Sequence, residues 1–445
     1  MASLSCAGGV PLALPLKTKD TLLGRLQNMR FLAVSVATTI LNYYWNGPEV
    51  ESWSLRFHIF RDILRLYLAE SLPHSMPNDA SESIDFALIA DYIAINNFTA
   101  HPLHPSEGCS REHAIVLDTA SCVRYGTPHY GLSGAKLDAM AASDLQAAQR
   151  GDPRSISCQV VLSARTATRL GVSVQDTTHS MGVYGERLLA PNPIEPDERV
   201  ILHLHGGAYC VGERSLSHIQ VFARMSHAAG LRVFSPDYRL APRHCFPSQL
   251  HDCFATYMSM LRRGFQPANM ILSGDSAGGA LALGLLFLLR DMRLPQPAAV
   301  VLISPWVDAT CSGKSWAASP TRDYLPALSL EDPFHPTRMF YAPGRRLSDE
   351  MLEELRCPLV SPIFGDCTGL PPMLVQMGRD ELLRDDIDAF AARLGQQGHA
   401  GASFCLEKYD NMPHAFVLFD FAKEAQQAFD SIGVFARTHT SGPRC

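Results

Sequence analysis

Residues 274–279 read Gly-Asp-Ser-Ala-Gly-Gly, and they are the stretch from which the fold can be inferred. The apolar residues 270–272 precede this stretch, and a long apolar run at 280–290 follows it. A Gly-x-Ser-x-Gly pattern between a strand and a helix is typical of a nucleophile elbow, a strained turn that presents the serine hydroxyl above a sheet edge. Gly274 and Gly278 permit close backbone approach where a Cβ would clash. We therefore predict that Ser276 is a nucleophile.

Apolar segments of strand length alternate with segments of helical pattern around this stretch. Helical patterns lie near residues 219–229, 250–261 and 280–290. Strands are expected between and beside them, at residues 200–204, 231–234, 270–272, 299–303 and 373–376. This alternation indicates an α/β fold, in which a mostly parallel central sheet carries helices on both faces.

The chain divides into two regions by its sequence pattern. We expect residues 1–155 to form an N-terminal helical cap region, in which residues 54–69 place apolar side chains at helical spacing. Residues 156–440 are expected to form the catalytic domain. Within that domain, residues 310–357 are rich in proline, serine and arginine. They predict an insertion over the active site and no strand.

A glycine-containing loop directly after the first apolar strand predicts an oxyanion site. His205, Gly206, Gly207 and Ala208 follow residues 200–204. Acyl transfer generates an oxyanion, which preorganised N–H groups stabilise. We expect the donors to be the backbone N–H groups of Gly207, Ala208 and Ala277, with His205 and Gly206 shaping the turn.

The remaining members of a catalytic triad should follow the serine in the order acid and then histidine. His414 lies in a loop after a strand-like stretch at 403–408, where the general base belongs. Two adjacent carboxylates, Asp380 and Glu381, lie after the strand expected at 373–376. Either of them could hold the Nδ1–H of the histidine.

Taken together, these motifs resemble the hormone-sensitive-lipase-like family of esterases, the fold-3 group of the α/β-hydrolase fold. The shared stretches occur in family order at 205–209, 237–242, 274–279, 304–308, 369–372, 381–385 and 414–416. The sequence is similar to fungal members, including steryl-acetate and secondary-metabolite esterases. The resemblance implies an α/β-hydrolase fold, an N-terminal helical cap and a serine nucleophile, and it implies neither a metal nor an organic cofactor.

The resemblance also bears on the acid, and the chain departs from the family pattern in three places. The family acid sits in an Asp-x-Leu-x-Asp pattern, which favours Glu381 in this register; Asp380 would take the role if the loop were shifted by one residue. Ala208 replaces the third glycine of a His-Gly-Gly-Gly motif, so its methyl group narrows the acyl site. Arg243 stands where family members carry an acidic residue, and the N-terminal extension is long.

Bulk composition excludes several other classes of protein. The 445 residues include 47% hydrophobic and 18% charged residues, which is ordinary for a globular protein. The net charge of -6 does not suggest a nucleic-acid partner. The 12 cysteines are scattered, with neither a disulfide pattern nor metal-ligand spacing, so we expect reduced thiols and no metal site.

An apolar run at residues 31–45 follows Lys17, Lys19, Arg25 and Arg30. It is shorter than the ~20 residues that a membrane-spanning helix needs. We interpret it as a segment for peripheral association with a membrane surface. An intracellular protein is expected, either cytoplasmic or attached to the endoplasmic-reticulum membrane, and its oligomeric state is left open.

The leading hypothesis is hydrolysis of a small-acyl ester, for example an acetate, of an apolar alcohol such as a terpenoid, sterol or polyketide. An acyl-serine intermediate would form on Ser276. The alternative enzyme hydrolyses a lactone or an amide, or acts as a lyase, because one fold can serve several reactions. A non-catalytic ligand receptor fits less well, since it would be expected to lose Ser276 or His414.

Overall fold

The computed structural model describes most of the chain and divides it into two compact units. The units comprise Met1–Ser83 and Ile84–Cys445. The described residues are 22–71, 108–117, 119, 122–126, 130–169, 197–212, 216–318, 322–397 and 404–440.

The smaller unit contains the described helices α1 (Leu22–Asn46) and α2 (Leu55–Ser71). They pack on each other, and the Thr39 hydroxyl of α1 donates a 2.8 Å hydrogen bond to Asp62 of α2. Helix α2 confirms the helix expected at 54–69, and α1 includes the apolar run at 31–45. No helix in the described ranges has both the length and the apolar character that crossing a bilayer requires.

In the described part of the larger unit, an eight-stranded sheet has the spatial order β1-β2-β4-β3-β5-β6-β7-β8. Its strands are β1 (Gly108–Val116), β2 (Ser155–Ser163), β3 (Val200–Leu204), β4 (Arg232–Pro236), β5 (Met270–Asp275), β6 (Ala299–Ile303), β7 (Met373–Gly378) and β8 (Phe404–Tyr409). All neighbours from β4 to β8 are parallel, whereas β1–β2 and β2–β4 are antiparallel. The mostly parallel sheet expected from the sequence is confirmed.

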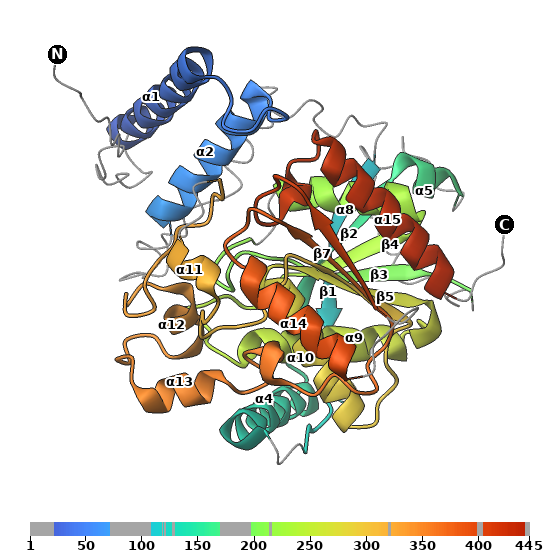
Figure 1. Ribbon diagram of the computed structural model, residues 1–445. Coiled ribbons are helices and arrows are strands. Elements are labelled where there is room, and N and C mark those ends of the chain that lie inside the picture. Colours follow the sequence, from blue (N-terminus) through green and yellow to red (C-terminus); the bar gives the residue numbers. More distant parts are fainter. Residues whose placement is uncertain are drawn as a thin grey trace, which may run out of the picture. The chain divides into compact units, whose positions relative to one another are not determined.

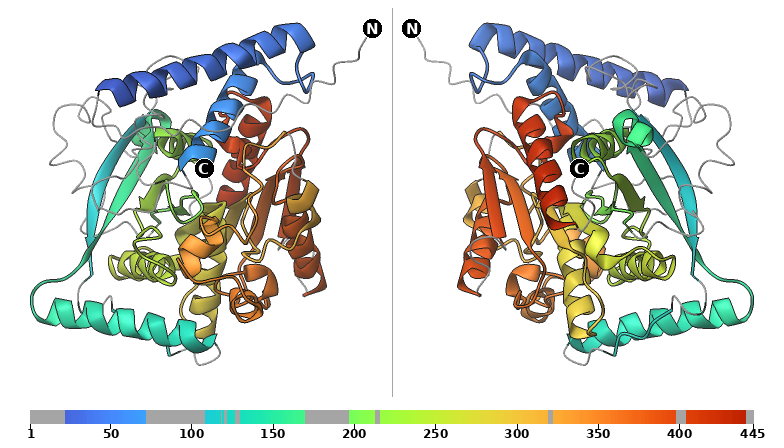
Figure 2. Two further views of the ribbon diagram at one scale, coloured as in Figure 1. Left: turned by 90° about the vertical axis from the view of Figure 1, so that its left-hand side faces the viewer. Right: turned by 90° about the vertical axis from the view of Figure 1, so that its right-hand side faces the viewer.

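Helices cover both faces of this sheet (Figures 1 and 2). Helices α8 (Leu216–Ala229) and α15 (Lys423–His439) pack against each other on one face. The other face carries α9 (Ser248–Arg262), α10 (Ala277–Asp291) and α14 (Arg384–Gln396). Strands β3 to β7 are consequently buried along their whole length, which explains their nearly continuous apolar sequences.

Strand β1 corrects one expectation about the N-terminal region. It lies within residues 1–155, which we expected to be helical, yet it pairs with β2 at the edge of the sheet. Its first residues read Gly-Cys-Ser-Arg-Glu-His and lack the apolar pattern of a buried strand. An edge strand depends on pairing with its neighbour, and a local pattern does not reveal that pairing. The domain boundary at residue 155 stays a prediction.

The chain between β6 and β7 contains no strand in the described residues of 310–357, as expected. This segment instead has the short helices α11 (Lys314–Ala318), α12 (Pro336–Tyr341) and α13 (Asp349–Leu355). The remaining elements are α4 (Gly131–Gln149), α5 (Ala164–Arg169) and the 3₁₀ turns η2 (Pro267–Asn269), η3 (Pro362–Phe364) and η5 (Phe416–Leu418).

Candidate active site

Ser276 forms the sharp turn between β5 and α10. Its backbone has φ 53° and ψ −122°, and a side-chain-bearing residue in such a region costs on the order of 1–3 kcal/mol. The following strand holds this turn in place. The Ser276 amide donates to the Ile303 carbonyl at 2.9 Å, and the Ser276 carbonyl accepts from the Trp306 amide at 2.9 Å. The predicted strand–turn–helix geometry is therefore present at Ser276.

The two glycines of the elbow are required by close packing. A Cβ on Gly278 would overlap the main-chain carbonyls of Leu204 and His205, at the end of β3. A Cβ on Gly274 would overlap the carbonyl of Gly278. The elbow and the end of β3 are thus in direct backbone contact. This contact places the loop after β3 against the N-terminus of α10.

The loop after β3, residues 205–212, is here called the glycine loop. Gly207 has φ 113°, and a Cβ there would overlap the Val211 carbonyl. Ala208 also has a positive φ, of 54°. In the described part of the chain, the amide N–H groups of Gly207, Ala208 and Ala277 donate to no protein acceptor. These are the three groups that we expected to bind an oxyanion.

The buried carboxylate of Asp275 anchors the glycine loop from below. Its Oδ1 accepts from the Gly206 amide at 2.9 Å and lies 3.0 Å from Nε2 of His203. Burial would raise the pKa of Asp275, but the imidazoles of His203 and His218 lower it below its usual range. Asp275 is therefore an anion that fixes the loop directly beside the elbow.

His205, the first residue of the glycine loop, is packed and neutral. Its ring stacks on Tyr238 with a centroid distance of 4.2 Å, and its Nδ1 lies 2.7 Å from the Gly206 carbonyl. Burial and the neighbouring His218 lower the pKa of His205 to about 3. These contacts support a role in shaping the turn.

The structure separates the two carboxylates that were candidates for the acid. Glu381 is fully buried, and its Oε2 accepts from the Ser304 hydroxyl at 2.6 Å and from the Gly378 amide at 3.0 Å. Burial raises the pKa of Glu381, and the bond from Ser304 opposes that rise. Asp380 instead forms an ion pair of 3.1 Å with Arg322, a side chain that is 42% exposed. Of the two, Glu381 alone is directed into the protein.

His414 lies in the base loop, residues 410–416, and is buried. Its amide donates to Asp323 Oδ1 at 3.1 Å, and the amide of Ala415 donates to the Ser304 hydroxyl at 3.0 Å. Burial lowers the pKa of His414 to about 4, and the negative charge of Asp275 acts against this decrease. The imidazole is therefore neutral near pH 7. It is close enough to Asp275, the residue before Ser276, for the charge of that carboxylate to affect its pKa.

One buried polar atom of Glu381 and one of His414 have no partner in the described structure. They are Oε1 of Glu381 and Nδ1 of His414. No hydrogen bond joins Ser276, His414 and Glu381 to one another among the described residues. Catalytic hydrogen bonds often form fully only when substrate is bound.

Comparisons with known proteins identify the family of this chain. Residues 201–418 match the family described as "alpha/beta hydrolase fold". An "Acetyl-hydrolase" of Streptomyces hygroscopicus is 37% identical over 56% of this chain and 78% of its own length. An "Esterase" of Acinetobacter venetianus is 32% identical over 57% of this chain and 79% of its own length. The chain belongs to the hormone-sensitive-lipase-like esterases.

Solved structures of related enzymes support the same family. A hormone-sensitive lipase from a metagenome library is 26% identical, has a TM-score of 0.50, and matches 64% of this chain and 82% of its own. An esterase from the bacterial hormone-sensitive lipase family is 24% identical with a TM-score of 0.55, over 85% and 99% of the two chains. At that identity the second likeness shows the fold alone.

Three aromatic side chains of this esterase pack together where the glycine loop meets the segment after β6. Tyr209, in the glycine loop, stacks on Phe340 of α12 with centroids 3.7 Å apart. Trp306 lies 5.7 Å from the Tyr209 ring, and its own amide is bonded to the Ser276 carbonyl. A stacked aromatic cluster therefore joins the glycine loop to the segment whose backbone holds Ser276.

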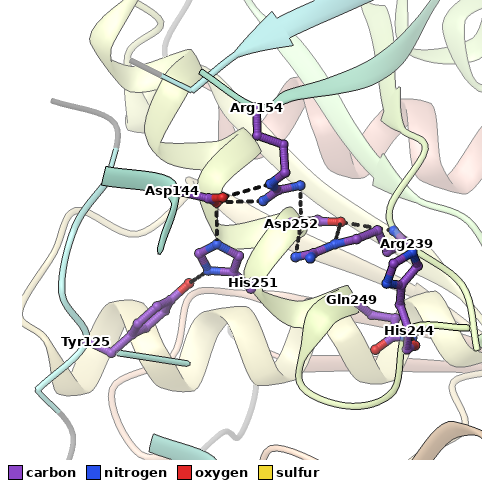
Figure 3. Close-up of polar contacts among 8 residues, drawn as sticks. All are labelled: Tyr125, Asp144, Arg154, Arg239, His244, Gln249, His251 and Asp252. Atoms are coloured by element: carbon purple, nitrogen blue, oxygen red, sulfur yellow. Dashed lines mark hydrogen bonds and ion pairs between the residues drawn. The ribbon is translucent and has the colours of Figure 1, made fainter. Parts of the chain in front are cut away.

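A polar network around Asp252 holds residues 239–241, the segment that is hydrogen-bonded to the glycine loop (Figure 3). Asp252 of α9 accepts from the Arg239 backbone at 3.0 Å, from its guanidinium at 2.8 and 2.9 Å, and pairs with Arg154 at 2.8 Å. The amide of Ala241 then donates to the Tyr209 carbonyl at 2.9 Å. Figure 3 also labels Tyr125, Asp144, His244, Gln249 and His251.

Sequence reasoning missed Asp275, His203, Ser304 and Asp323 as residues that organise the site. Asp275 and Ser304 lie within quoted motifs, at 274–279 and 304–308, and their polar side chains at the ends of apolar strands could have been noticed. Asp323 has no local signal for this role, because the two partners that it links, Leu382 and His414, lie in distant loops. Within the described residues, no group of three His, Cys, Asp or Glu side chains is placed to hold a metal ion.

Proposed function

We propose that this esterase hydrolyses a small-acyl ester of an apolar alcohol through an acyl intermediate on Ser276. The observation that carries this proposal is the strained turn of Ser276 between β5 and α10, beside three main-chain N–H groups that donate to no acceptor in the described part of the chain. Such a turn exposes a nucleophile to a substrate carbonyl, and such amides can stabilise the resulting oxyanion.

In the proposed reaction, Nε2 of His414 takes the proton of Ser276 as the hydroxyl attacks the ester carbonyl. The neutral state of His414 suits this role, because only an unprotonated imidazole can act as a base. Glu381 then holds the Nδ1–H and stabilises the imidazolium. That contact would satisfy the two buried atoms, Oε1 and Nδ1, that are otherwise without partners.

The remaining steps follow from the same groups. The N–H groups of Gly207, Ala208 and Ala277 stabilise the tetrahedral oxyanion, aided by the N-terminus of α10. His414 returns its proton to the departing alcohol, and water then attacks the acyl-Ser276 with His414 again as the base.

A small acyl group, such as acetyl, is supported by three features of the chain and its relatives. Tyr209 and Phe340 form a stacked, buried pair beside the site, and Ala208 adds a methyl group to the glycine loop. One relative is named "Acetyl-hydrolase". We propose a terpenoid, sterol or polyketide as the apolar alcohol, as in fungal secondary metabolism.

The test is a series of p-nitrophenyl esters of increasing acyl length, assayed with the full-length protein. The value of kcat/KM should be highest for acetate and fall steadily with longer chains. Equal rates for acetate and decanoate would contradict the small-acyl proposal. Matched lactone and amide substrates separate ester hydrolysis from the alternative reactions, and labelling of Ser276 by a fluorophosphonate separates an enzyme from a ligand receptor.

We further propose peripheral attachment of the protein to an intracellular membrane, such as the endoplasmic reticulum, through residues 31–45. The support is one face of α1, on which Val34, Leu41 and Trp45 recur at helical spacing and are 58%, 67% and 89% exposed. Tyr44 beside them is 75% exposed. Aromatic side chains on an apolar helical face favour the membrane interface. Flotation with phosphatidylcholine vesicles tests this attachment, and a cytoplasmic protein without it would not float.

A further inference from the structure

The acid loop, residues 378–383, and the base loop lie side by side after two parallel neighbours, β7 and β8. Their backbones are joined directly, because the Asp380 amide donates to the Met412 carbonyl at 3.1 Å and the Arg379 amide donates to the Tyr409 carbonyl at 3.0 Å. These bonds align the two loops. They do not involve the residue proposed as the base.

A third segment reaches both loops through the carboxylate of Asp323. This residue lies between β6 and β7, in the segment that carries the short helices α11 to α13, and it is 1% exposed. Its Oδ2 accepts from the Leu382 amide at 2.6 Å, and its Oδ1 accepts from the His414 amide at 3.1 Å. One carboxylate therefore binds the residue next to Glu381 and the backbone of His414 itself.

The side chain of Ser304 forms a second bridge between the same two loops. The Ser304 hydroxyl donates to Glu381 and accepts from the Ala415 amide. The two bridges thus join consecutive residues of one loop to consecutive residues of the other. Ser304 links Glu381 with Ala415, and Asp323 links the adjacent Leu382 with His414.

The chemistry of Asp323 suits a clamp that needs two acceptor oxygens. A carboxylate has acceptors on both sides, whereas an amide or a hydroxyl of similar size cannot accept from two opposed N–H groups in the same way. Burial raises the pKa of Asp323 to about 6, and the N–H groups of Leu382 and His414 act against that rise. A buried carboxyl group is costly in an apolar interior unless such bonds satisfy it.

We propose that Asp323 is a positioning residue that sets His414 relative to Glu381 and Ser276 by clamping the acid loop to the base loop. This inference rests on the proposed function, in which His414 is the general base. Asp323 touches neither substrate nor the reacting atoms, and it acts through the position of the imidazole. A displacement of about 1 Å in a catalytic group can lower a rate by about 10²-fold.

The test compares Asp323→Asn with a matched change, Asp308→Asn. Asp308 is also fully buried and accepts N–H and O–H groups, but the partners are Thr310 and Ser312 of its own segment. With p-nitrophenyl acetate, Asp323→Asn should lower kcat by about 10- to 100-fold while KM stays within about twofold. Asp308→Asn should change kcat by less than about threefold, and it controls for a general loss of stability.

A double mutant shows whether the effect passes through the base. Because Asp323 acts on His414, adding Asp323→Asn to His414→Ala should cause no further loss of kcat. Asp323→Ser, whose shorter hydroxyl leaves at least one of the two N–H groups without its acceptor, provides a second variant if the asparagine variant is unstable. Its kcat should fall at least as far as that of Asp323→Asn.

Two results would overturn the inference. One is a kcat of Asp323→Asn equal to that of the Asp308→Asn control, and the other is a full additional loss in the His414→Ala background. If Ser276→Ala and His414→Ala retain activity, the proposed function itself fails and the inference fails with it. If those two variants are inactive while Asp323→Asn resembles its control, only the role of Asp323 is disproved.

Discussion

The Ser304 hydroxyl donates a 2.6 Å hydrogen bond to Oε2 of Glu381. Ser304 directly follows β6, the strand that pairs with β5 and so neighbours the nucleophile elbow. Glu381, the proposed acid, is therefore oriented from the strand next to the one that leads to Ser276. Its second oxygen, Oε1, has no partner among the described residues and is available to a histidine.

This contact predicts which of two adjacent carboxylates is the acid. Glu381→Gln should lower kcat by about 10³-fold or more, because an amide cannot stabilise an imidazolium. Asp380→Asn should change kcat by less than about threefold, since it removes only a partly exposed ion pair with Arg322. Steady-state kinetics on p-nitrophenyl acetate measure both variants, and circular dichroism checks that each is folded. A crippled Asp380→Asn enzyme would mean that the loop is shifted by one residue.

Loss of the nucleophile should be far more severe than loss of binding contacts. Ser276→Ala should reduce kcat by about 10⁶-fold without unfolding the protein, and His414→Ala should be comparably inactive. Because the two residues act as a unit, the double variant should be little worse than either single one. Activity of Ser276→Ala above about a hundredth of the wild type would disprove the assignment, since no covalent intermediate could then be required.

The pH dependence should reflect the low pKa of the base. His414 has a pKa of about 4 in the folded protein, so its active neutral form persists as the pH falls through the usual histidine range. At about pH 6.5 kcat/KM should therefore remain at about three quarters of its value at about pH 8, the remaining loss coming from Asp323, whose pKa burial raises to about 6. A base with the ordinary pKa of about 6.5 would by itself lose half. The measurement is a pH profile with p-nitrophenyl acetate, corrected for spontaneous hydrolysis. A midpoint near pH 6.5 would contradict the burial effect.

The contact between the elbow and the end of β3 predicts a large effect of a single methyl group. Gly278→Ala should lower kcat by about 10²-fold or more and reduce the melting temperature, because the new Cβ would overlap the Leu204 and His205 carbonyls. Gly284→Ala, on the same helix, meets Leu250 at an ordinary 3.4 Å and should keep full activity. Thermal unfolding and kcat are measured for both. Equal behaviour of the two variants would show that the backbone contact is unimportant.

Attachment to a membrane surface should depend on the apolar face of α1. The double variant Leu41→Ser/Trp45→Ser should reduce flotation with phosphatidylcholine vesicles several-fold, because it removes apolar area that would enter the interface. Activity on soluble p-nitrophenyl acetate should be unchanged. Asn42→Ser, at an exposed polar position of the same helix, is the control. Wild-type protein that does not float at all would exclude this attachment.

The sequence by itself determined the features that depend on neighbours along the chain. Apolar strands between helical patterns predict a covered parallel sheet, and the glycines around Ser276 predict a strained elbow, because both follow from local backbone geometry and side-chain periodicity. The position of His414 after the last strand was found in the same way. Strand β1 was not predicted. An edge strand is stabilised by pairing with its neighbour, and it need not have an apolar pattern of its own.

Only the tertiary structure decided the features that depend on distant segments. Glu381 and Asp380 are adjacent and chemically alike, and it is burial against Ser304 that separates them from each other. Asp323 acquires its contacts to Leu382 and His414 only when three loops meet at the ends of β6, β7 and β8. The Tyr324 amide beside Asp323 also donates to it, but the two bonds that link the loops come from residues 59 and 91 positions away in the chain.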